Sequence, residues 1–312
     1  MALLIGTEDG VYRAREGDGA QAEQVLDAGR VLRVRRFDAV DGVFAATQTG
    51  LYRSHDRGDS WTDLGVPRTE VYSVAPNPDG SRLYAGTHPA HLYVSTDDGD
   101  SWTELDGFQD LPSRAEWHTP RHRNEAHVRS LGTHSDVPDR VVAGVEVGGV
   151  HVSDDRGETW VERRNGVHDD VHHVLVRDAD TYVASCGGGL YLTRDAGQSW
   201  PARLDATLDR NYFREAFWHD GVLYAAAARS APPTWRGDRG ADAALYESTD
   251  MGDSFREVPY PGGPEEVVLA WTAHQGTVVA GTHGGRLIRR AGDGRWTELG
   301  AVPASIHSLA SV

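Results

Sequence analysis

One polar octapeptide recurs along the chain and limits the folds open to it. It reads STDDGDSW at 95–102, with further copies SHDRGDSW (54–61), SDDRGETW (153–160), TRDAGQSW (193–200) and STDMGDSF (248–255), and a degenerate RRAGDGRW at 289–296. Successive closing aromatics are separated by 41, 58, 40, 55 and 41 residues. A period near 40 residues with two insertions indicates a repeat architecture in which every unit forms one supersecondary structure.

A second repeated pattern fixes the number of units. Two alternating apolar segments joined by a turn of small residues, the pattern of a β-hairpin, occur seven times, from LLIGTEDGVYR near the N-terminus to VVAGTHGGRLI at 278–288. A further apolar run precedes each hairpin except the first, and SIHSLASV at 305–312 supplies the missing one. Seven units of four short strands predict an all-β, seven-bladed β-propeller, whose ring closes when the C-terminal strand joins the N-terminal blade.

The whole chain, 1–312, is expected to be one propeller domain. Its predicted blades span 305–312 with 1–28, 30–65, 69–107, 125–165, 169–206, 210–259 and 264–300. The octapeptides fall between the third and fourth strands, at one face of the ring. The insertions, 108–125 and 229–243, fall at the other face, where the innermost strands begin around the channel mouth. Long loops on a regular scaffold commonly carry function, so this mouth is the predicted site.

The octapeptide resembles the Asp-box (BNR) motif, S-x-D-x-G-x-[ST]-W, of sialidases, sortilin-type receptors, xyloglucanases and photosystem II assembly factors. The resemblance extends over the full chain and implies a propeller fold, whereas the tasks of such propellers differ. A structural role explains the motif: the Asp accepts hydrogen bonds from turn amides, Gly permits positive φ, and Trp packs between sheets. The aspartates expected in this structural role are Asp56, Asp97, Asp155, Asp195 and Asp250.

Histidine, arginine, tyrosine and acidic residues gather at the predicted mouth. The predicted metal ligands are His127, His172 and His307, with His88, His118, His122 and His283 as further candidates. The predicted substrate-binding residues are Arg33, Tyr72, Trp117, Arg121, Arg129, Arg214, Arg229 and Trp235. The predicted catalytic residues are Tyr212, Glu215 and His173. Whether His172 or His173 faces the channel stays open, because neighbours in a strand point to opposite sides.

Three functions fit these residues. In the first, imidazoles hold a divalent transition metal and arginines clamp an anionic small molecule or sugar, as in a metal-dependent hydrolase or lyase. In the second, the same face is a non-catalytic scaffold for a protein partner, as it is in photosystem II assembly factors with these repeats. In the third, Tyr212 and Glu215 form the nucleophile pair of a sialidase-like glycosidase, although the Arg-Ile-Pro signature of sialidases is absent.

The composition limits the partners and the cellular location that are expected for this chain. The chain has 47 acidic and 31 basic residues, for a net charge of −16, and every basic residue is Arg. This acidity argues against a nucleic-acid partner and indicates a high-salt cytoplasm. A lone cysteine, Cys186, excludes an internal disulfide framework. The N-terminus has no basic segment of a signal peptide, and no apolar run is long enough to span a membrane, so a cytoplasmic protein is expected.

Overall fold

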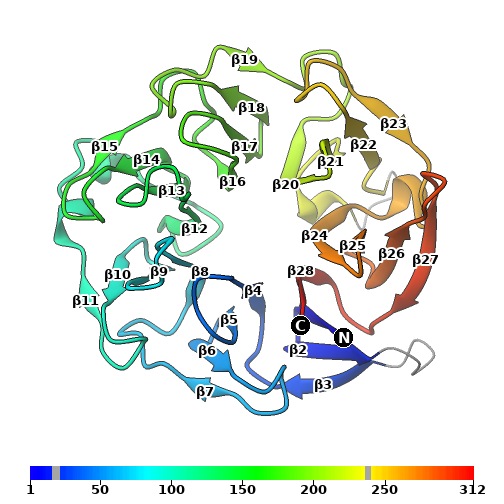
Figure 1. Ribbon diagram of the computed structural model, residues 1–312. Coiled ribbons are helices and arrows are strands. Elements are labelled where there is room, and N and C mark those ends of the chain that lie inside the picture. Colours follow the sequence, from blue (N-terminus) through cyan, green and yellow to red (C-terminus); the bar gives the residue numbers. More distant parts are fainter. Residues whose placement is uncertain (16–21, 236–239) are drawn as a thin grey trace.

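The computed structural model describes residues 1–15, 22–235 and 240–312, and they form a ring of seven four-stranded antiparallel sheets (Figure 1). The structure confirms the predicted seven-bladed β-propeller. In each blade the first strand of the repeat lies innermost, and the strands follow one another outwards. The helical structure in the described residues consists of the short 3-10 turns η1 (Asp106–Phe108), η2 (Arg114–Glu116), η3 (Pro232–Thr234) and η4 (Gly263–Glu265). None of the described helices is long and apolar enough to cross a membrane.

The strands are named by blade, from the axis outwards. The blade that contains both termini has β28 (Ile306–Ser311), β1 (Ala2–Thr7), β2 (Val11–Arg15) and β3 (Ala22–Leu26). The second has β4 (Val31–Arg36), β5 (Val43–Thr47), β6 (Leu51–Ser54) and β7 (Thr62–Asp63), and the third has β8 (Val71–Pro76), β9 (Leu83–Thr87), β10 (Leu92–Ser95) and β11 (Thr103–Glu104). The fourth has β12 (His127–Gly132), β13 (Val141–Glu146), β14 (Gly149–Ser153) and β15 (Val161–Glu162).

The remaining three blades follow the same order. The fifth has β16 (Val171–Val176), β17 (Tyr182–Cys186), β18 (Gly189–Thr193) and β19 (Ala202–Arg203). The sixth has β20 (Tyr212–His219), β21 (Val222–Ala228), β22 (Ala244–Ser248) and β23 (Arg256–Val258). The seventh has β24 (Val268–His274), β25 (Thr277–Thr282), β26 (Arg286–Arg290) and β27 (Trp296–Ala301).

The two chain termini close the ring, as the sequence predicts. β28 pairs antiparallel with β1, with Ile5 opposite Leu309, so the C-terminal strand becomes the inner strand of the N-terminal blade. The two ends lie close together in Figure 1. This pairing removes an exposed strand edge at the place where an open ring would leave one.

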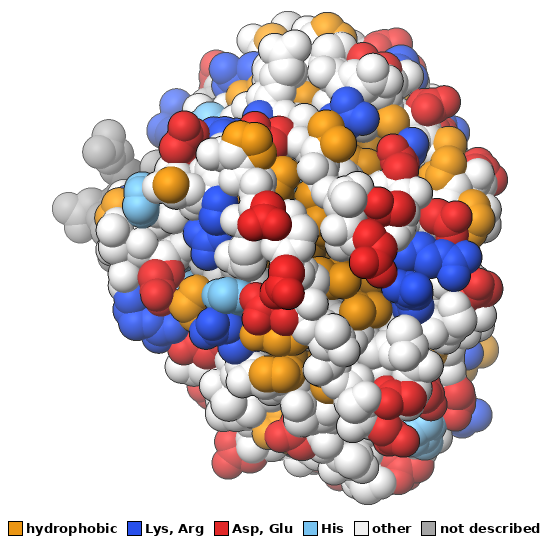
Figure 2. Space-filling model, turned by 90° about the vertical axis from the view of Figure 1, so that its left-hand side faces the viewer, with side chains coloured by type: hydrophobic (Ala, Val, Ile, Leu, Met, Phe, Trp, Pro, Cys, Tyr) orange, Lys and Arg blue, Asp and Glu red, His pale blue; other side chains and the backbone are white. Residues whose placement is uncertain are grey.

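The hydrophobic core lies between neighbouring blades. Phe44 and Leu51 of the second blade, for example, pack with Val71, Val74 and Tyr93 of the third. Because every blade is covered on both faces, the second strands are buried at each successive position instead of alternating with solvent. Acidic groups and arginines are interspersed over the side of the ring shown in Figure 2.

Each complete octapeptide forms a hydrogen-bonded turn between the third and fourth strands. In the third blade, Asp97 Oδ1 accepts hydrogen bonds from Ser95 Oγ at 2.8 Å and from the Ser101 amide at 2.9 Å. Ser101 Oγ donates to Asp97 Oδ2. These hydrogen bonds lower the pKa of Asp97 to about 2, and those from Ser101 have the largest effect. Gly99 has φ +98°, a conformation that glycine adopts without steric cost. The same carboxylate bonds recur at Asp56, Asp155, Asp195 and Asp250.

A β-bulge near the start of the inner strand recurs in every blade. The register skips one residue, or two in β20, at nearly the same place. A bulge re-aims side chains and increases the local twist of a strand. The residues left out of the ladder are Leu32, Tyr72, Arg129, His172, Arg214 with Glu215, Leu269 and His307. At these positions the type of side chain differs from blade to blade.

Candidate functional site

A cavity of about 550 Å³ opens at the channel mouth. Four inner strands supply its walls through Tyr72, Arg129, His172, Tyr212 and Arg214. The insertion 108–125 contributes the segment 119–122, and the insertion 229–243, whose residues 236–239 lie outside the described part, contributes 231–233. Two further cavities, of about 290 and 450 Å³, adjoin it and share Arg30 with it. Both insertions therefore cover the same mouth.

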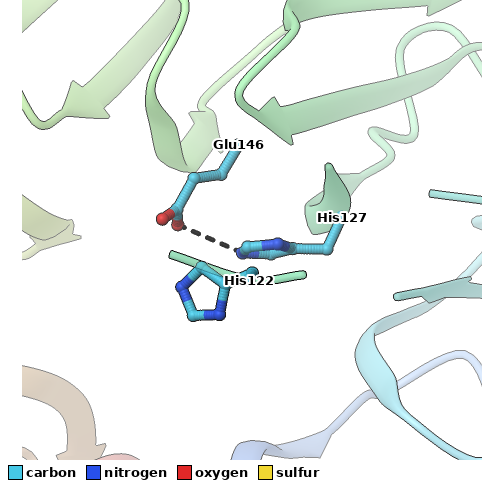
Figure 3. Close-up of side chains that lie close together, drawn as sticks. All are labelled: His122, His127 and Glu146. Atoms are coloured by element: carbon cyan, nitrogen blue, oxygen red, sulfur yellow. Dashed lines mark ion pairs between the residues drawn. The ribbon is translucent and has the colours of Figure 1, made fainter. Parts of the chain in front are cut away.

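The carboxylate of Glu146 lies at the centre of the cavity wall. It ends β13, and 8% of the residue is exposed. Arg129 Nη1 donates to Glu146 Oε2, and His127 Nε2 lies 3.3 Å from the same oxygen (Figure 3). Burial alone would raise the pKa of Glu146, but the charges of Arg129 and His127 outweigh it and hold the pKa well below its usual range. Glu146 is therefore an anion at neutral pH.

Aromatic rings surround His127, which is fully buried at the start of β12. Its ring centroid lies 4.3 Å from that of Tyr72, 5.0 Å from that of His122 and 5.4 Å from that of His88. Burial lowers the pKa of His127 to about 4, so its imidazole is neutral at pH 7. Its Nδ1 has no hydrogen-bond partner among the described residues. His122, from the insertion, points toward the same place in Figure 3.

His172 belongs to the mouth. Its Nδ1 donates a hydrogen bond of 2.5 Å to the carbonyl oxygen of Phe213, and its Nε2 lies 3.4 Å from Asp170 Oδ1 and 3.9 Å from Glu146 Oε2. The Tyr212 ring packs against His172 at 4.9 Å between centroids. Burial raises the pKa of Tyr212 above its ordinary value, so its phenol stays neutral and can donate a proton in a hydrogen bond.

A second layer of polar side chains lies deeper in the channel, further along the inner strands. Glu215 Oε1 accepts a hydrogen bond of 2.7 Å from Arg35, and His173 Nε2 lies 3.8 Å from the same oxygen. Burial lowers the pKa of His173 to about 4. Arg33, from the second blade, reaches across the channel and donates to the carbonyl oxygen of His172 at 3.2 Å. The three predicted catalytic residues are thus divided, with Tyr212 in the mouth and Glu215 and His173 in this deeper layer.

Four of the predicted substrate-binding side chains do not line the mouth cavity: Arg33, which lies in the deeper layer, and Trp117, Arg229 and Trp235. Trp117 is 3% exposed and packs against Phe108 and Trp160, because the insertion folds its own apolar residues inward. Arg229 pairs with Asp242 within its own loop. Trp235 is buried beside Tyr212 and lines the adjoining cavity of about 450 Å³.

The other predicted metal ligands are spread around the mouth. His88 Nδ1 lies 2.6 Å from Glu70 Oε2, and His307 Nε2 lies 2.6 Å from Glu8 Oε2. His283 accepts a hydrogen bond from the Val267 amide. His118 is exposed on the insertion. The set His127, His172 and His307 is therefore not one cluster. Within the described part of the chain, two trios have ligand atoms within 4.8 Å of one another: His122, His127 and Glu146, and Glu146, Asp170 and His172.

Sequence reasoning did not assign roles to Glu146, Asp170 or Arg30. Glu146 is the last residue of β13 and Asp170 directly precedes β16, but an acidic chain has many acidic residues at such positions. Arg30 precedes β4 in a connection with no distinctive pattern. Arg121 and Arg214 do line the cavity as predicted.

The repeat also matches a known family model. Residues 51–64 match the BNR-Asp box repeat. The chain is a seven-bladed β-propeller whose third and fourth strands are joined by Asp-box turns in five of the blades. A comparison of this propeller with curated protein sequences found no match.

Solved structures share the fold of this Asp-box propeller. An ancestral GH74 enzyme is 18% identical with a TM-score of 0.63, over 87% of this chain and 39% of that one. The GH74 xyloglucanase from Xanthomonas campestris is 21% identical with a TM-score of 0.63, over 86% and 45%. YCF48 bound to D1 peptide is 15% identical with a TM-score of 0.63, over 92% and 87%. The chain thus spans less than half of either GH74 enzyme and most of YCF48.

Proposed function

We propose that the channel mouth binds a small anionic molecule, such as a phosphate or a sugar acid, and acts on it as a hydrolase or lyase. The observation that supports this proposal is the state of two arginines on the cavity wall. Among the described residues, neither Arg121 nor Arg214 forms an ion pair with an acidic side chain, and Arg214 donates a hydrogen bond of 3.3 Å to the hydroxyl of Tyr212.

In a chain with a net negative charge, an arginine without an acidic partner indicates a site for an anionic ligand. Acidic residues outnumber basic ones by 47 to 31, and many arginines of the chain pair with a carboxylate. An arginine that faces a cavity without such a partner has its fork of donors available for a ligand. A guanidinium binds carboxylate and phosphate in a bidentate manner, with hydrogen bonds stronger than those between neutral groups.

The cavity also holds groups that can donate and accept protons in hydrogen bonds. The phenol of Tyr212 is held neutral next to Arg214, and the carboxylate of Asp170 is part-exposed to the cavity. A hydroxyl donor and a carboxylate in one cavity can hydrogen-bond a ligand and orient it for reaction. The sialidase-like alternative has less support, since Glu215 pairs with Arg35 in the deeper layer instead of with Tyr212.

Binding of simple anions by metal-free protein tests this proposal. The probes are inorganic phosphate and glucuronate, titrated by calorimetry into wild type and into the double variant Arg121→Gln, Arg214→Gln. Each charge-assisted contact contributes about 1.5–3 kcal/mol, so the double variant should bind at least about tenfold more weakly. Arg289→Gln is the control, because this exposed arginine lies at a separate cavity. Equal affinity in the wild type and the double variant would refute the arginine clamp.

A protein-interaction scaffold is the second candidate. Its support is the similarity to YCF48, which carries a bound peptide and of which the match covers 87%. The same arginines would then hold the carboxylates of an acidic peptide. Product analysis separates the two functions, since an enzyme converts its ligand whereas a scaffold returns it intact.

A further inference from the structure

The hydrogen bond of His172 orients its ring. Because Nδ1 donates to the carbonyl oxygen of Phe213, Nε2 is the ring nitrogen that faces the cavity wall. Nε2 lies 3.4 Å from Asp170 Oδ1 and 3.9 Å from Glu146 Oε2. One imidazole nitrogen and two carboxylates thus converge on one region of the cavity wall, with their ligand atoms within 4.8 Å of one another.

The spacing of these atoms fits a metal ion. With metal–ligand bonds of about 2.0–2.2 Å, neighbouring ligand atoms lie roughly 2.8–3.6 Å apart at angles between 90° and 109°. The separation of His172 Nε2 and Asp170 Oδ1, 3.4 Å, is within this range, and that to Glu146, 3.9 Å, is slightly above it. All three residues line the cavity, so an ion among them would keep an open side toward a ligand.

We propose that Glu146, Asp170 and His172 bind one divalent transition-metal ion in the wall of the mouth cavity. One imidazole with two carboxylates suits Mn²⁺ or Zn²⁺. Its role rests on the proposed function: the ion would take one oxygen of the anion that Arg214 holds, and would act there as a Lewis acid.

Contacts behind the three residues hold them in place. The Phe213 carbonyl orients His172, and Arg129 orients Glu146. Asp170 depends on Gly187, since a Cβ at Gly187 would lie 2.0 Å from Asp170 Oδ2. Outer contacts of this kind commonly change metal affinity by about 10–100-fold. Gly187 is therefore a positioning residue for the site.

The neighbouring trio, His122, His127 and Glu146, is a weaker candidate. Arg129 Nη1 lies 3.4 Å from His127 Nε2 and also pairs with Glu146 Oε2, so a guanidinium already occupies the region between them. Moreover, Arg129 Nη1 donates to His127 Nε2, so the lone pair of that nitrogen already has a partner. An ion in that trio would have to displace Arg129 from both His127 and Glu146. An ion among Glu146, Asp170 and His172 would compete with Arg129 for Glu146 alone, since no hydrogen bond joins Arg129 to Asp170 or His172 within the described residues.

Calorimetric titration of untagged, chelator-treated protein with MnCl₂ and with ZnCl₂ tests the site. Wild type should bind one ion per chain, and Asp170→Asn should weaken binding at least about tenfold. Asp169→Asn is the matched control, because Asp169 is the exposed neighbour of Asp170 and its side chain lies outside the trio. Gly187→Ala should also weaken binding, although it leaves all three ligands in the chain. Gly188→Ala, where a Cβ would meet His168 instead, is its control.

Three outcomes would overturn the proposed metal site. A wild type that binds neither ion, or equal losses in Asp169→Asn and Asp170→Asn, excludes the site. Loss in His122→Ala with full binding in Asp170→Asn places the ion in the other trio. The metal-free protein separates this proposal from the previous one: if it binds phosphate through Arg214 and no ion binds, the anion site stands and the metal site fails.

Discussion

Acidification should destabilise the propeller through a histidine that lies outside the mouth. His151 in β14 is fully buried, with its ring 4.8 Å from that of Trp117 and its Nε2 3.1 Å from the carbonyl oxygen of Gly148. Its Nδ1 has no hydrogen-bond partner among the described residues. Burial lowers the pKa of His151 to about 4, because an imidazolium there would lose its hydration.

The size of the effect follows from proton linkage. The unfolded chain takes up the proton near pH 6.5, and the folded chain only near pH 4, so this stability is present above pH 6.5 and is lost as the pH falls between these values. At pH 5 the unfolded histidine is almost fully protonated, while the folded one is about one-tenth protonated. The free energy of unfolding should therefore be about 2 kcal/mol smaller at pH 5 than at pH 7 on account of His151.

Comparison with His151→Leu isolates this contribution, because groups that are independent of position 151 cancel in the difference. Urea unfolding followed by tryptophan fluorescence, at pH 7 and at pH 5, gives the free energies, provided that the unfolding is reversible and the slopes agree. Between the two pH values the leucine variant should lose about 2 kcal/mol less than the wild type. If both proteins lose the same amount, His151 is not held neutral by burial and the reasoning fails.

Three further perturbations test the fold. Gly99→Ala should destabilise the protein by about 1 kcal/mol or more, seen as a lower melting temperature, because Gly99 has φ +98° and a Cβ would press on Leu64. Hydrogen bonds hold the pKa of Asp97 and of Asp250 at about 2, so stability should fall as the pH drops from about 4 to 2, and asparagine at both positions should flatten that part of the curve. Deletion of 306–312 should expose β1 to fast amide hydrogen exchange, whereas unchanged protection would argue against ring closure by β28.

The fold was predictable because it repeats. Each blade carries its own turn signals, and the count of hairpins predicts both the ring and its closure. The site was predictable only in part. Topology placed Tyr212, Arg214 and His172 at the mouth, since inner strands begin there. The high-salt and cytoplasmic expectations stay predictions.

The limits of sequence reasoning at the site have physical causes. A bulge breaks the two-residue alternation of side chains along a strand. The sequence spacing could therefore not show whether His172 or His173 faces the channel. The resulting layers separate Tyr212 from Glu215 although only two residues lie between them. Trp117 was expected to face a ligand, but the insertion packs Phe108, Leu111 and Trp117 into the core between the third and fourth blades.

The recurring bulge explains how one repeat supports a site that does not repeat. It occurs in all seven inner strands, and the residues that it frees from the ladder differ in each blade, from Leu32 and Leu269 to Arg129 and His172. The Asp boxes, which determine the turns, lie at the opposite ends of the strands. Substitution at a bulge can therefore alter the chemistry of the mouth while the turn hydrogen bonds and the packing between blades remain. This separation places the Asp-box turns at one face of the propeller and the mouth cavity at the other.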